Sequence, residues 1–216
     1  MIKDIKAQVG YWDRVAEEKR FSHPLRVDWL ARYSKGTAAR ILDYGCGYGR
    51  TLAELARANY RKVVGTDFSE AMLRRAQAEV SNSLLVRNDG KTLPIKGGSF
   101  DAVLLFAVLT CIPNDNDQQS LISEVERVLR PGGLLYISDL LINQDLRNRK
   151  RYERDAERFN CYGVFELPEG VVVRHHRKEW IGQLLSSFEQ LEDEPFTVTT
   201  MNGNPSSAFQ YLGRKS

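Results

Sequence analysis

The chain has 216 residues, of which 42% are hydrophobic and 27% are charged, and its 31 basic and 28 acidic residues give a formal net charge of +3. This composition is typical of a soluble globular protein with a substantial core, and so small a basic excess gives no indication of a nucleic-acid partner. No apolar run approaches the roughly 20 residues of a membrane span, and the N-terminus has no apolar signal core, so no membrane partner is expected.

Cysteine and histidine usage narrows the chemistry further. The three cysteines, Cys46, Cys111 and Cys161, lie far apart and form no CxxC pair, which is typical of reduced thiols in a cytoplasmic protein. The histidines do not combine with them into a pattern of metal-ligand spacing. We therefore expect no metal, and the sequence does not indicate an oligomeric state.

Three alternating glycines, Gly45, Gly47 and Gly49, follow an apolar run over residues 39–44 that predicts a buried strand. A helix is predicted over residues 51–59 from apolar side chains at helical spacing. A strand, a glycine turn and a helix in this order place free backbone N–H groups and the positive end of the helix beside a crevice. Such a crevice suits an elongated small molecule that carries a nucleoside.

The spacing of the glycines argues against a dinucleotide. In the G-x-G-x-x-G pattern of NAD and FAD sites the third glycine comes one position later, and Arg50 stands here where that pattern requires Gly or Ala. Asp43 lies before the first glycine, and its carboxylate would repel a pyrophosphate but attract an ammonium group. A nucleotide-dependent oxidoreductase is therefore a disfavoured alternative.

Strand-like apolar runs continue at residues 62–67, 83–87, 101–106 and 134–140, separated by predicted helices at 69–80 and 117–130. This alternation predicts βαβ units in a doubly wound α/β fold with a mostly parallel sheet. The second strand ends in Asp67, an acid that can accept hydrogen bonds from both hydroxyls of a ribose. Asp89 and Gly90 follow the third strand, where a carboxylate can accept from an adenine amino group.

After residue 142 the alternation stops. The charged stretch at 143–160 contains a basic run at 147–154, which we interpret as a solvated helix face, with an anion site as the alternative. A further helix is predicted over residues 178–188. Two strands at 192–201 and 207–213, joined by a turn-rich loop, predict an antiparallel pair that closes the sheet.

Several motifs of this chain match, in order and spacing, those of the class I methyltransferases that depend on S-adenosylmethionine (SAM). They are Leu42-Asp43-x-Gly45-Cys46-Gly47-x-Gly49, Gly65-x-Asp67-x-Ser69, Asp89-Gly90, Ser99-Phe100-Asp101 and Leu129-Arg130-Pro131-Gly132-Gly133. The chain resembles the small-molecule members of this family over residues 39–140. The resemblance implies SAM as cofactor and a doubly wound, seven-stranded, mostly parallel sheet with an antiparallel last strand and helices on both faces. It also implies one methyltransferase domain over residues 1–216, with an N-terminal helical cap at about 1–35 and a lid-like insertion at about 143–177.

The resemblance also assigns cofactor roles. Asp43 and Gly45 would hold the methionine amino end of SAM, and Asp67 would bind its ribose hydroxyls. The backbone carbonyl of Phe106 would accept from the ammonium group. The predicted cofactor-binding residues are Trp12, Asp43, Gly45, Cys46, Gly47, Asp67, Phe68, Met72, Asp89, Gly90 and Phe106.

Several of these residues have purely structural alternatives. Asp67 could stabilise a helix N-terminus, Asp89 could be a turn former, and Trp12 could pin its helix to the sheet. The side chains of Phe68 and Met72, which would line the adenine, are also compatible with the core, and Cys46 with a small filler of the loop.

The chemistry implied by the resemblance is in-line transfer of the SAM methyl group to a small molecule, which releases S-adenosylhomocysteine (SAH). The fourth strand continues as Ala107-Val108-Leu109-Thr110 and lacks the Asp/Asn-Pro-Pro-aromatic motif that marks methylation of amino groups on nucleobases or glutamine. A noncatalytic SAM- or SAH-binding protein of the same fold is the alternative. The catalytic candidates are His175, His176 and Tyr11, although both histidines could equally lie exposed at a strand end. The acceptor is not identified.

Overall fold

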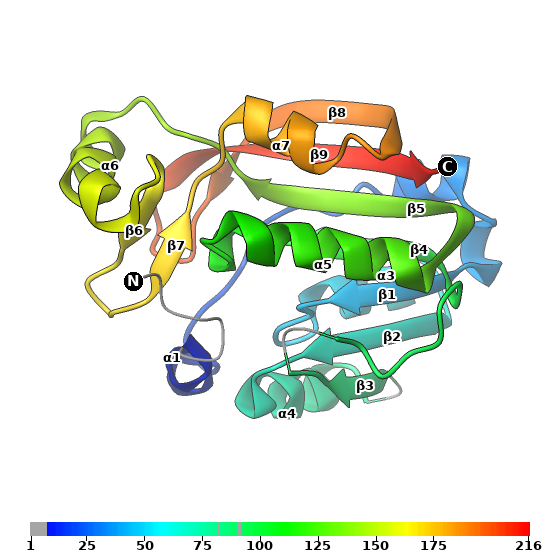
Figure 1. The fold of residues 1–216 in the computed structure, drawn as a ribbon. Coiled ribbons are helices and arrows are strands. Elements are labelled where there is room, and N and C mark those ends of the chain that lie inside the picture. The colour runs from blue at the N-terminus through cyan, green and yellow to red at the C-terminus, as the bar shows by residue number, and fades with distance from the viewer. Residues whose placement is uncertain (1–7, 82, 90–91) are drawn as a thin grey trace.

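The structure, a computed structural model, describes residues 8–81, 83–89 and 92–216. Seven strands form one sheet in the order β3-β2-β1-β4-β5-β9-β8 (Figure 1). Their bounds are β1 Arg40–Tyr44, β2 Lys62–Asp67, β3 Leu84–Arg87, β4 Phe100–Phe106, β5 Leu129–Leu140, β8 Phe188–Thr199 and β9 Pro205–Lys215. Strands β1 to β5 pair in parallel, and β9 runs antiparallel to both β5 and β8. The predicted mostly parallel sheet with an antiparallel last strand is confirmed.

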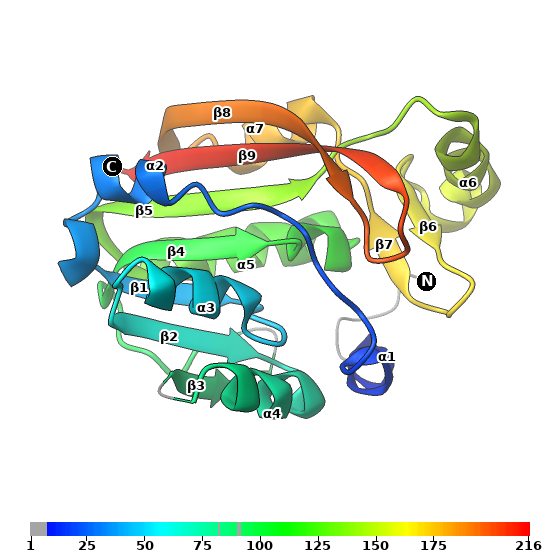
Figure 2. The ribbon, with the colours of Figure 1, turned by 180° about the vertical axis from the view of Figure 1, so that it is seen from behind.

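Helices cover both faces of this sheet. The face seen in Figure 1 carries α5 (Asp115–Val128) and α7 (Lys178–Leu184). The opposite face, seen in Figure 2, carries α2 (Val27–Tyr33), α3 (Arg50–Arg57) and α4 (Glu70–Glu79). Every residue of β4 is buried between these layers. A strand covered on both faces has a continuous apolar sequence, which is why the pattern predicted it.

Side-chain caps fix where two of the helices begin. The Oγ atom of Ser69 accepts from the backbone N–H of Met72 at 3.2 Å, and α4 therefore starts directly after β2, as expected. The side chain of Asn114 accepts from the backbone N–H of Asn116 at 2.8 Å at the start of α5. Both helix N-termini thus lie at the carboxyl end of the strand that precedes them.

Several element boundaries differ from the predictions. α5 ends at Val128 and β5 begins at Leu129, whereas the predicted helix ran to residue 130 and the predicted strand began at residue 134. The β4–β5 register shifts between Phe100 and Ala102, and this irregularity lets the strand accommodate a glycine at positive φ. α7 is also shorter than predicted, because the chain turns after Leu184 to enter β8.

A further group of elements lies beyond the carboxyl ends of the parallel strands (Figures 1 and 2). It consists of α1 (Val9–Val15), α6 (Leu146–Phe159) and a separate hairpin of β6 (Val164–Glu166) and β7 (Val172–Arg174). Their apolar side chains form one buried cluster with residues of α4 and of the glycine turn. This cluster lies where the strand order reverses between β1 and β4, the place at which open α/β sheets bind ligands.

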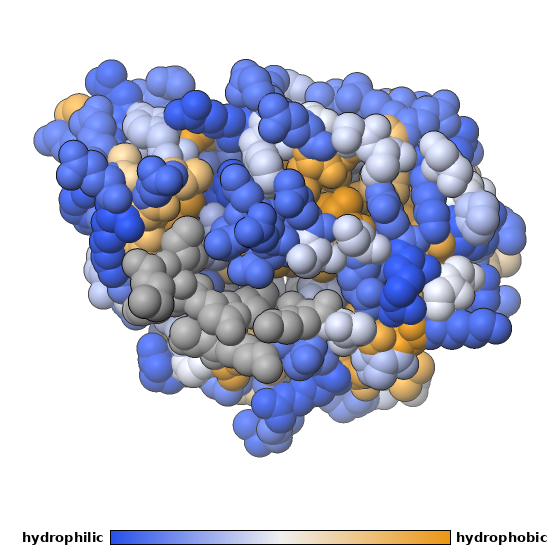
Figure 3. Space-filling view, in the orientation of Figure 1, coloured by the Kyte–Doolittle hydropathy of each residue, from blue (hydrophilic) through white to orange (hydrophobic). Residues whose placement is uncertain are grey.

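The outer surface is mostly hydrophilic on the face seen in Figure 3, with hydrophobic side chains gathering over α7 and β5. Ile181, Leu184 and Leu185 of this region belong to the main core cluster, so the apolar gathering is the visible edge of that core. Among the described residues, no helix combines the length and the apolar character that a bilayer span requires.

Candidate functional site

Two adjoining cavities open at the carboxyl ends of the parallel strands. The first cavity is lined by the glycine turn, by α1 and by residues at the ends of β2 and β4. The second cavity is lined by residues of α6, of the β6–β7 hairpin and of the loop between β8 and β9. Trp12, Phe21, Ala107 and Cys111 line both cavities. Molecules that occupy the two cavities would therefore meet at this shared wall.

The first cavity gathers most of the predicted cofactor-binding residues. Those that line it are Trp12, Gly45, Cys46, Gly47, Asp67, Phe68, Met72 and Phe106. Asp43 lies directly behind the glycine turn and is not among the lining residues. Asp89 is exposed, accepts from the backbone N–H of Thr92 at 3.2 Å and does not line the cavity either. Gly90 lies outside the described residues.

The glycine turn is held by hydrogen bonds that need its unusual backbone. The N–H groups of Gly45 and Cys46 both donate to the carbonyl of Thr66, at 2.7 and 2.9 Å. Gly45 has a φ of +71°, and a Cβ atom there would lie 2.7 Å from Cγ2 of Val108. Gly47 has a φ of +52° and faces open space, with Sδ of Met72 the nearest atom to a Cβ there, at 4.0 Å. The turn therefore leaves room for a ligand at Gly47 and packs tightly at Gly45.

Substituting Gly45 by Ala is expected to destabilise the protein more than substituting Gly36 by Ala. Both positions have positive φ, but a Cβ at Gly36 would meet no heavy atom within 4 Å. The Gly36 variant should lose about 1 kcal/mol of unfolding free energy from the backbone alone, and the Gly45 variant about 1–3 kcal/mol more from the clash with Val108. Urea unfolding of the two variants measures the difference, and equal losses would mean that Val108 moves aside without strain.

The carboxylate of Asp67 binds the backbone of the glycine turn and can still accept hydrogen bonds from a ligand. Its Oδ2 atom accepts from the N–H of Gly47 at 2.9 Å, and its Oδ1 atom accepts from the N–H of Ser69 at 2.9 Å. Burial raises the pKa of this carboxyl to about 6, against the effect of these backbone hydrogen bonds. Each carboxylate oxygen has a second lone pair, so Asp67 can also accept from hydroxyl groups in the first cavity.

The carboxylate of Asp43, two residues before Gly45, has one oxygen without a partner among the described residues. The residue is 1% exposed, and its Oδ2 atom has no hydrogen-bond partner among the described residues. Burial raises the pKa of the Asp43 carboxyl to about 7, partly offset by the positive charge of Arg50. A buried carboxylate without a partner is costly, and a bound cation would supply the missing interaction.

The aromatic residues of α1 take different positions. Trp12 lines both cavities, whereas Tyr11 lines neither and packs edge-on against Trp12 with ring centroids 5.0 Å apart. Burial raises the pKa of Tyr11 to about 12, so its phenol keeps its proton near pH 7. Tyr11 therefore lacks both the position and the protonation state of a general base. Asp13 anchors the helix, because its Oδ1 atom accepts from Oγ of Ser69 at 2.6 Å.

The thiol of Cys46 is not an activated nucleophile. Cys46 is buried, and like Cys111 and Cys161 it is a free thiol. Its Sγ atom makes a weak contact with the carbonyl of Gly47 at 3.7 Å. Burial, together with the negative charges of Asp43 and Asp67, raises the pKa of this thiol well above its usual value. The filler interpretation of Cys46 fits this environment.

Two imidazoles, of His23 and His175, line the second cavity. Burial lowers the pKa of His23 to about 4 and that of His175 to about 3, so both rings are neutral near pH 7. The Nδ1 atom of His23 lies 2.9 Å from Oγ of Ser138. His23 was not a predicted site residue, because it stands in a segment without a motif and reaches the cavity only through the tertiary fold.

Polar neighbours hold the ring of His175 in place through its Nδ1 atom. The hydroxyl of Tyr152 accepts from the N–H of Asn143 at 3.2 Å and lies 2.6 Å from Nδ1 of His175. The amide group of Asn143 is oriented by a hydrogen bond from Ser207 to its oxygen, so its Nδ2 atom, 3.3 Å from Nδ1, can only donate. The two amide hydrogens of Asn143 also face closer acceptors, the carbonyl of Leu141 at 2.7 Å and Oγ of Ser206 at 2.9 Å. The hydroxyl of Tyr152 is therefore the main partner of Nδ1, and it anchors the ring on the wall of the second cavity.

The structure does not bring His176 to either cavity. Its Nδ1 atom lies 3.0 Å from the carbonyl of Leu140, and its Nε2 atom lies 2.9 Å from Nε2 of Gln118. Burial lowers its pKa to about 3. Both ring nitrogens are therefore engaged, and His176 joins α5 to β5 inside the core and is not available for catalysis. The two histidines are neither exposed nor equivalent, unlike the strand-end interpretation.

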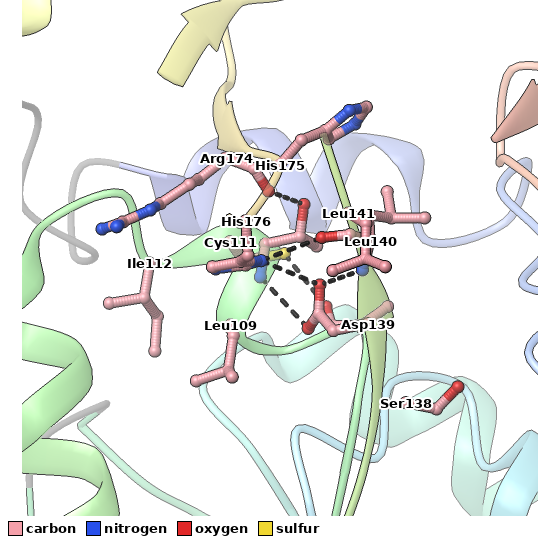
Figure 4. A network of polar contacts seen from close by, with 12 residues as sticks. Leu109, Cys111, Ile112, Ser138, Asp139, Leu140, Leu141, Arg174, His175 and His176 are labelled. Carbon is pink, nitrogen blue, oxygen red and sulfur yellow. Dashed lines mark hydrogen bonds and ion pairs between the residues drawn. The ribbon is translucent and has the colours of Figure 1, made fainter. Parts of the chain in front are cut away.

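Figure 4 shows the polar contacts that hold the segment 109–112, whose Cys111 lies on the shared wall of the two cavities. The carboxylate of Asp139 accepts from the N–H of Leu140 at 2.7 Å and from the N–H of Thr110 at 3.2 Å. The hydroxyl of Thr110 donates to the carbonyl of Arg174 at 2.7 Å. Ala107 has a φ of +56°, a strained value for a residue with a Cβ. The fully buried Asp139 therefore holds this strained turn against the β6–β7 hairpin.

Comparison with known proteins connects this geometry to a family. Residues 42–137 match the family described as "Methyltransferase domain". The chain is 34% identical over 171 residues to 27-O-demethylrifamycin SV methyltransferase of Amycolatopsis mediterranei, a match that covers 76% of this chain and 59% of the relative. It is 31% identical over 152 residues to a ubiquinone biosynthesis O-methyltransferase of Dechloromonas aromatica, covering 66% of this chain and 60% of the relative. The chain thus spans about three fifths of the length of these two relatives.

A solved structure agrees over a larger share. The crystal structure of a SAM-dependent methyltransferase from Methanosarcina mazei superposes with a TM-score of 0.80 at 27% sequence identity, covering 87% of this chain and 96% of that chain. The strand order, the glycine turn at the end of β1 and the buried acid at the end of β2 fit this likeness. In both sequence and fold, the chain is similar to the class I SAM-dependent methyltransferases.

Proposed function

We propose that this protein transfers the methyl group of SAM to a hydroxyl oxygen of a small molecule. The observation that carries the proposal is the pair of adjoining cavities, which meet at Trp12, Phe21, Ala107 and Cys111. The first cavity suits SAM and the second suits an acceptor, so that the reacting atoms would meet at the shared wall. Relatives named as O-methyltransferases support oxygen as the acceptor atom.

The residues of the first cavity fit SAM chemically. The unpartnered Oδ2 atom of Asp43 would face the ammonium group, helped by the backbone carbonyl of Phe106. Asp67 would accept from the ribose hydroxyls, and Gly47 would let the cofactor approach the backbone. Phe68 and Met72, which line the first cavity, would lie along the adenine.

The protein's contribution to the reaction is mainly alignment and exclusion of water. Bound SAM would supply a methyl group on a positively charged sulfur, and the sulfur would leave as the neutral thioether of SAH. Trp12 and Phe21, with ring centroids 6.1 Å apart, would shield this charge with aromatic faces, and Tyr11 supports Trp12 from behind. His23 also lines the second cavity, and its imidazole would take the acceptor's proton.

We further propose that the chain acts as one domain in which α1 and the residues to about 35 form a cap and residues 143–177 form a lid. The placement of α6 and of the β6–β7 hairpin along the second cavity supports the lid. Free thiols at Cys46, Cys111 and Cys161 support a cytoplasmic location. The small net charge supports a small-molecule partner in preference to a nucleic acid.

Two measurements test this proposal. Incubation with SAM labelled in the methyl group and a broad panel of hydroxyl-bearing small molecules should yield a labelled product. Calorimetry should show binding of SAM and SAH but not of NADH. SAM binding without label transfer to any acceptor would favour a noncatalytic SAM-binding protein. NADH binding without SAM binding would overturn the proposal altogether.

A further inference from the structure

Two arginines on one face of α6 line the second cavity. Arg147 and Arg151 are one helical turn apart, and both are among the residues that form the wall on the lid side. Neither lines the first cavity. Among the described residues, no aspartate or glutamate lines the second cavity. The wall of this cavity therefore carries positive charge that acidic neighbours within the wall do not balance.

Arg151 is the arginine of this pair that lacks a counter-charge. In the part of the chain that the structure describes, no carboxylate lies within 4.0 Å of its guanidinium, and its one polar side-chain contact is a long one, 3.5 Å to Oδ1 of Asn148. Arg147 has a loose ion pair with Asp145 at 3.8 Å. Burial, and the positive charge of Arg147, lower the pKa of Arg151 from its usual value.

Other arginines of α6 show what a solvated basic face looks like. Arg154 pairs with Asp155 at 2.6 Å, Arg158 pairs with Glu166 at 2.6 Å, and both arginine side chains are more than half exposed. Arg149 is exposed. The interpretation of the basic run as a solvated face thus holds for Arg149 and Arg154, while Arg147 and Arg151 face the cavity.

His175 lies on the same wall, where its Nδ1 atom is 2.6 Å from the hydroxyl of Tyr152. Phe165 links the two groups: its ring lies 5.4 Å from the guanidinium carbon of Arg151 and packs edge-on against the ring of His175 at 5.1 Å. Phe165 thus connects Arg151 to His175 on one wall of the cavity.

We propose that the acceptor carries a carboxylate, held in the second cavity by Arg151, with Arg147 as a further donor. This inference rests on the proposed function and names the substrate class within it. A planar carboxylate matches the fork of the guanidinium and would supply the counter-charge that Arg151 lacks. Because the arginines line the second cavity alone, the carboxylate lies at its lid end and leaves the hydroxyl free to reach the shared wall.

Binding to the SAH-saturated protein tests the proposal without requiring turnover. The probes are aromatic and aliphatic hydroxy acids, each paired with its methyl ester, and calorimetry measures their affinities. At least one acid should bind about tenfold or more tightly than its ester, because a charge-assisted pair is lost in the ester. High salt should weaken the binding of the acid more than that of the ester.

Variants of α6 assign the effect to Arg151. In Arg151→Gln the preference for the acid should disappear while the affinity for the ester stays the same, and Arg151→Lys should keep part of the preference. Arg149→Gln, on the exposed side of the same helix, should behave as the unmodified protein. Esters that bind as well as their acids, or an acid whose affinity is unchanged in Arg151→Gln, would overturn the proposal. A failure of methyl transfer alone would count against the proposed function, since the binding measurement needs no methyl transfer.

Discussion

Replacing Asp43 by Asn is expected to weaken SAM binding by about 2–5 kcal/mol, the range for removing one partner of a buried charge pair. Asp43 is 1% exposed and its Oδ2 atom lacks a partner among the described residues. The ammonium group of SAM would supply that partner. The amide of Asn has the same shape but no charge. Calorimetry with SAM and with SAH measures the loss, and both ligands should be affected because both carry the ammonium group.

The pH dependence separates this effect from a general disturbance of the site. Burial raises the pKa of Asp43 to about 7 in the free protein, and a bound ammonium would lower it again. Affinity should therefore rise as the pH increases toward about 7, because SAM no longer has to displace a proton from this carboxyl. Asp67, whose pKa burial raises to about 6, contributes a similar rise in both proteins. The difference between the unmodified protein and Asp43→Asn isolates the contribution of Asp43.

The stability of the free protein provides the control. A carboxyl with a raised pKa in the folded state keeps its proton at pH values where the unfolded chain has lost it. The unfolding free energy should therefore fall as the pH rises from about 4 to about 7, by at most about 1.4 kcal/mol per pH unit for each such group. Asp43→Asn should reduce this slope. A variant that binds SAM normally, or that keeps the full slope, would contradict the role given to Asp43.

The fold was predictable because its signals are local. The continuous apolar sequence of β4 and the glycine turn after β1 each report burial or backbone geometry at their own positions. The irregular start of β5 was not predicted, since Pro131, Gly132 and Gly133 are typical helix-ending residues when read along the chain. Their place in a strand depends on the pairing with β4, which no local pattern contains.

The first cavity followed from the sequence for the same reason, whereas the second did not. Asp67 and Gly47 belong to one motif-bearing region and meet within a single β–α–β unit, formed by β1, α3 and β2. The second cavity combines His23, Arg151 and residues near Asn202, which come from segments far apart in the chain. The i, i+4 spacing of Arg147 and Arg151 was a visible signal, but only the fold shows that this helix face points inward and that His175 and His176 face different surroundings.

Replacing Asp67 by Ala is expected to weaken binding of SAH by about 1–3 kcal/mol or more, because the ribose hydroxyls lose a buried acceptor. The same substitution leaves the N–H groups of Gly47 and Ser69 without their acceptor, so the glycine turn could loosen and account for the loss on its own. Asp67→Asn keeps one acceptor oxygen and should show a smaller loss in both affinity and unfolding free energy.

A ligand without ribose hydroxyls distinguishes the two causes. The unmodified protein should bind SAH more tightly than its 2′,3′-dideoxy analogue, because the carboxylate of Asp67 can accept only from the former. In Asp67→Ala the two ligands should bind with nearly equal affinity, since the acceptor is gone for both, and this double difference cancels the effect of the loosened turn. If Asp67→Ala weakens binding of the dideoxy analogue as much as it weakens binding of SAH, then Asp67 acts only through its hydrogen bonds to the backbone. An acid that both shapes the turn and binds the ribose is expected instead, because its two oxygens each keep a lone pair for the first cavity after bonding the backbone.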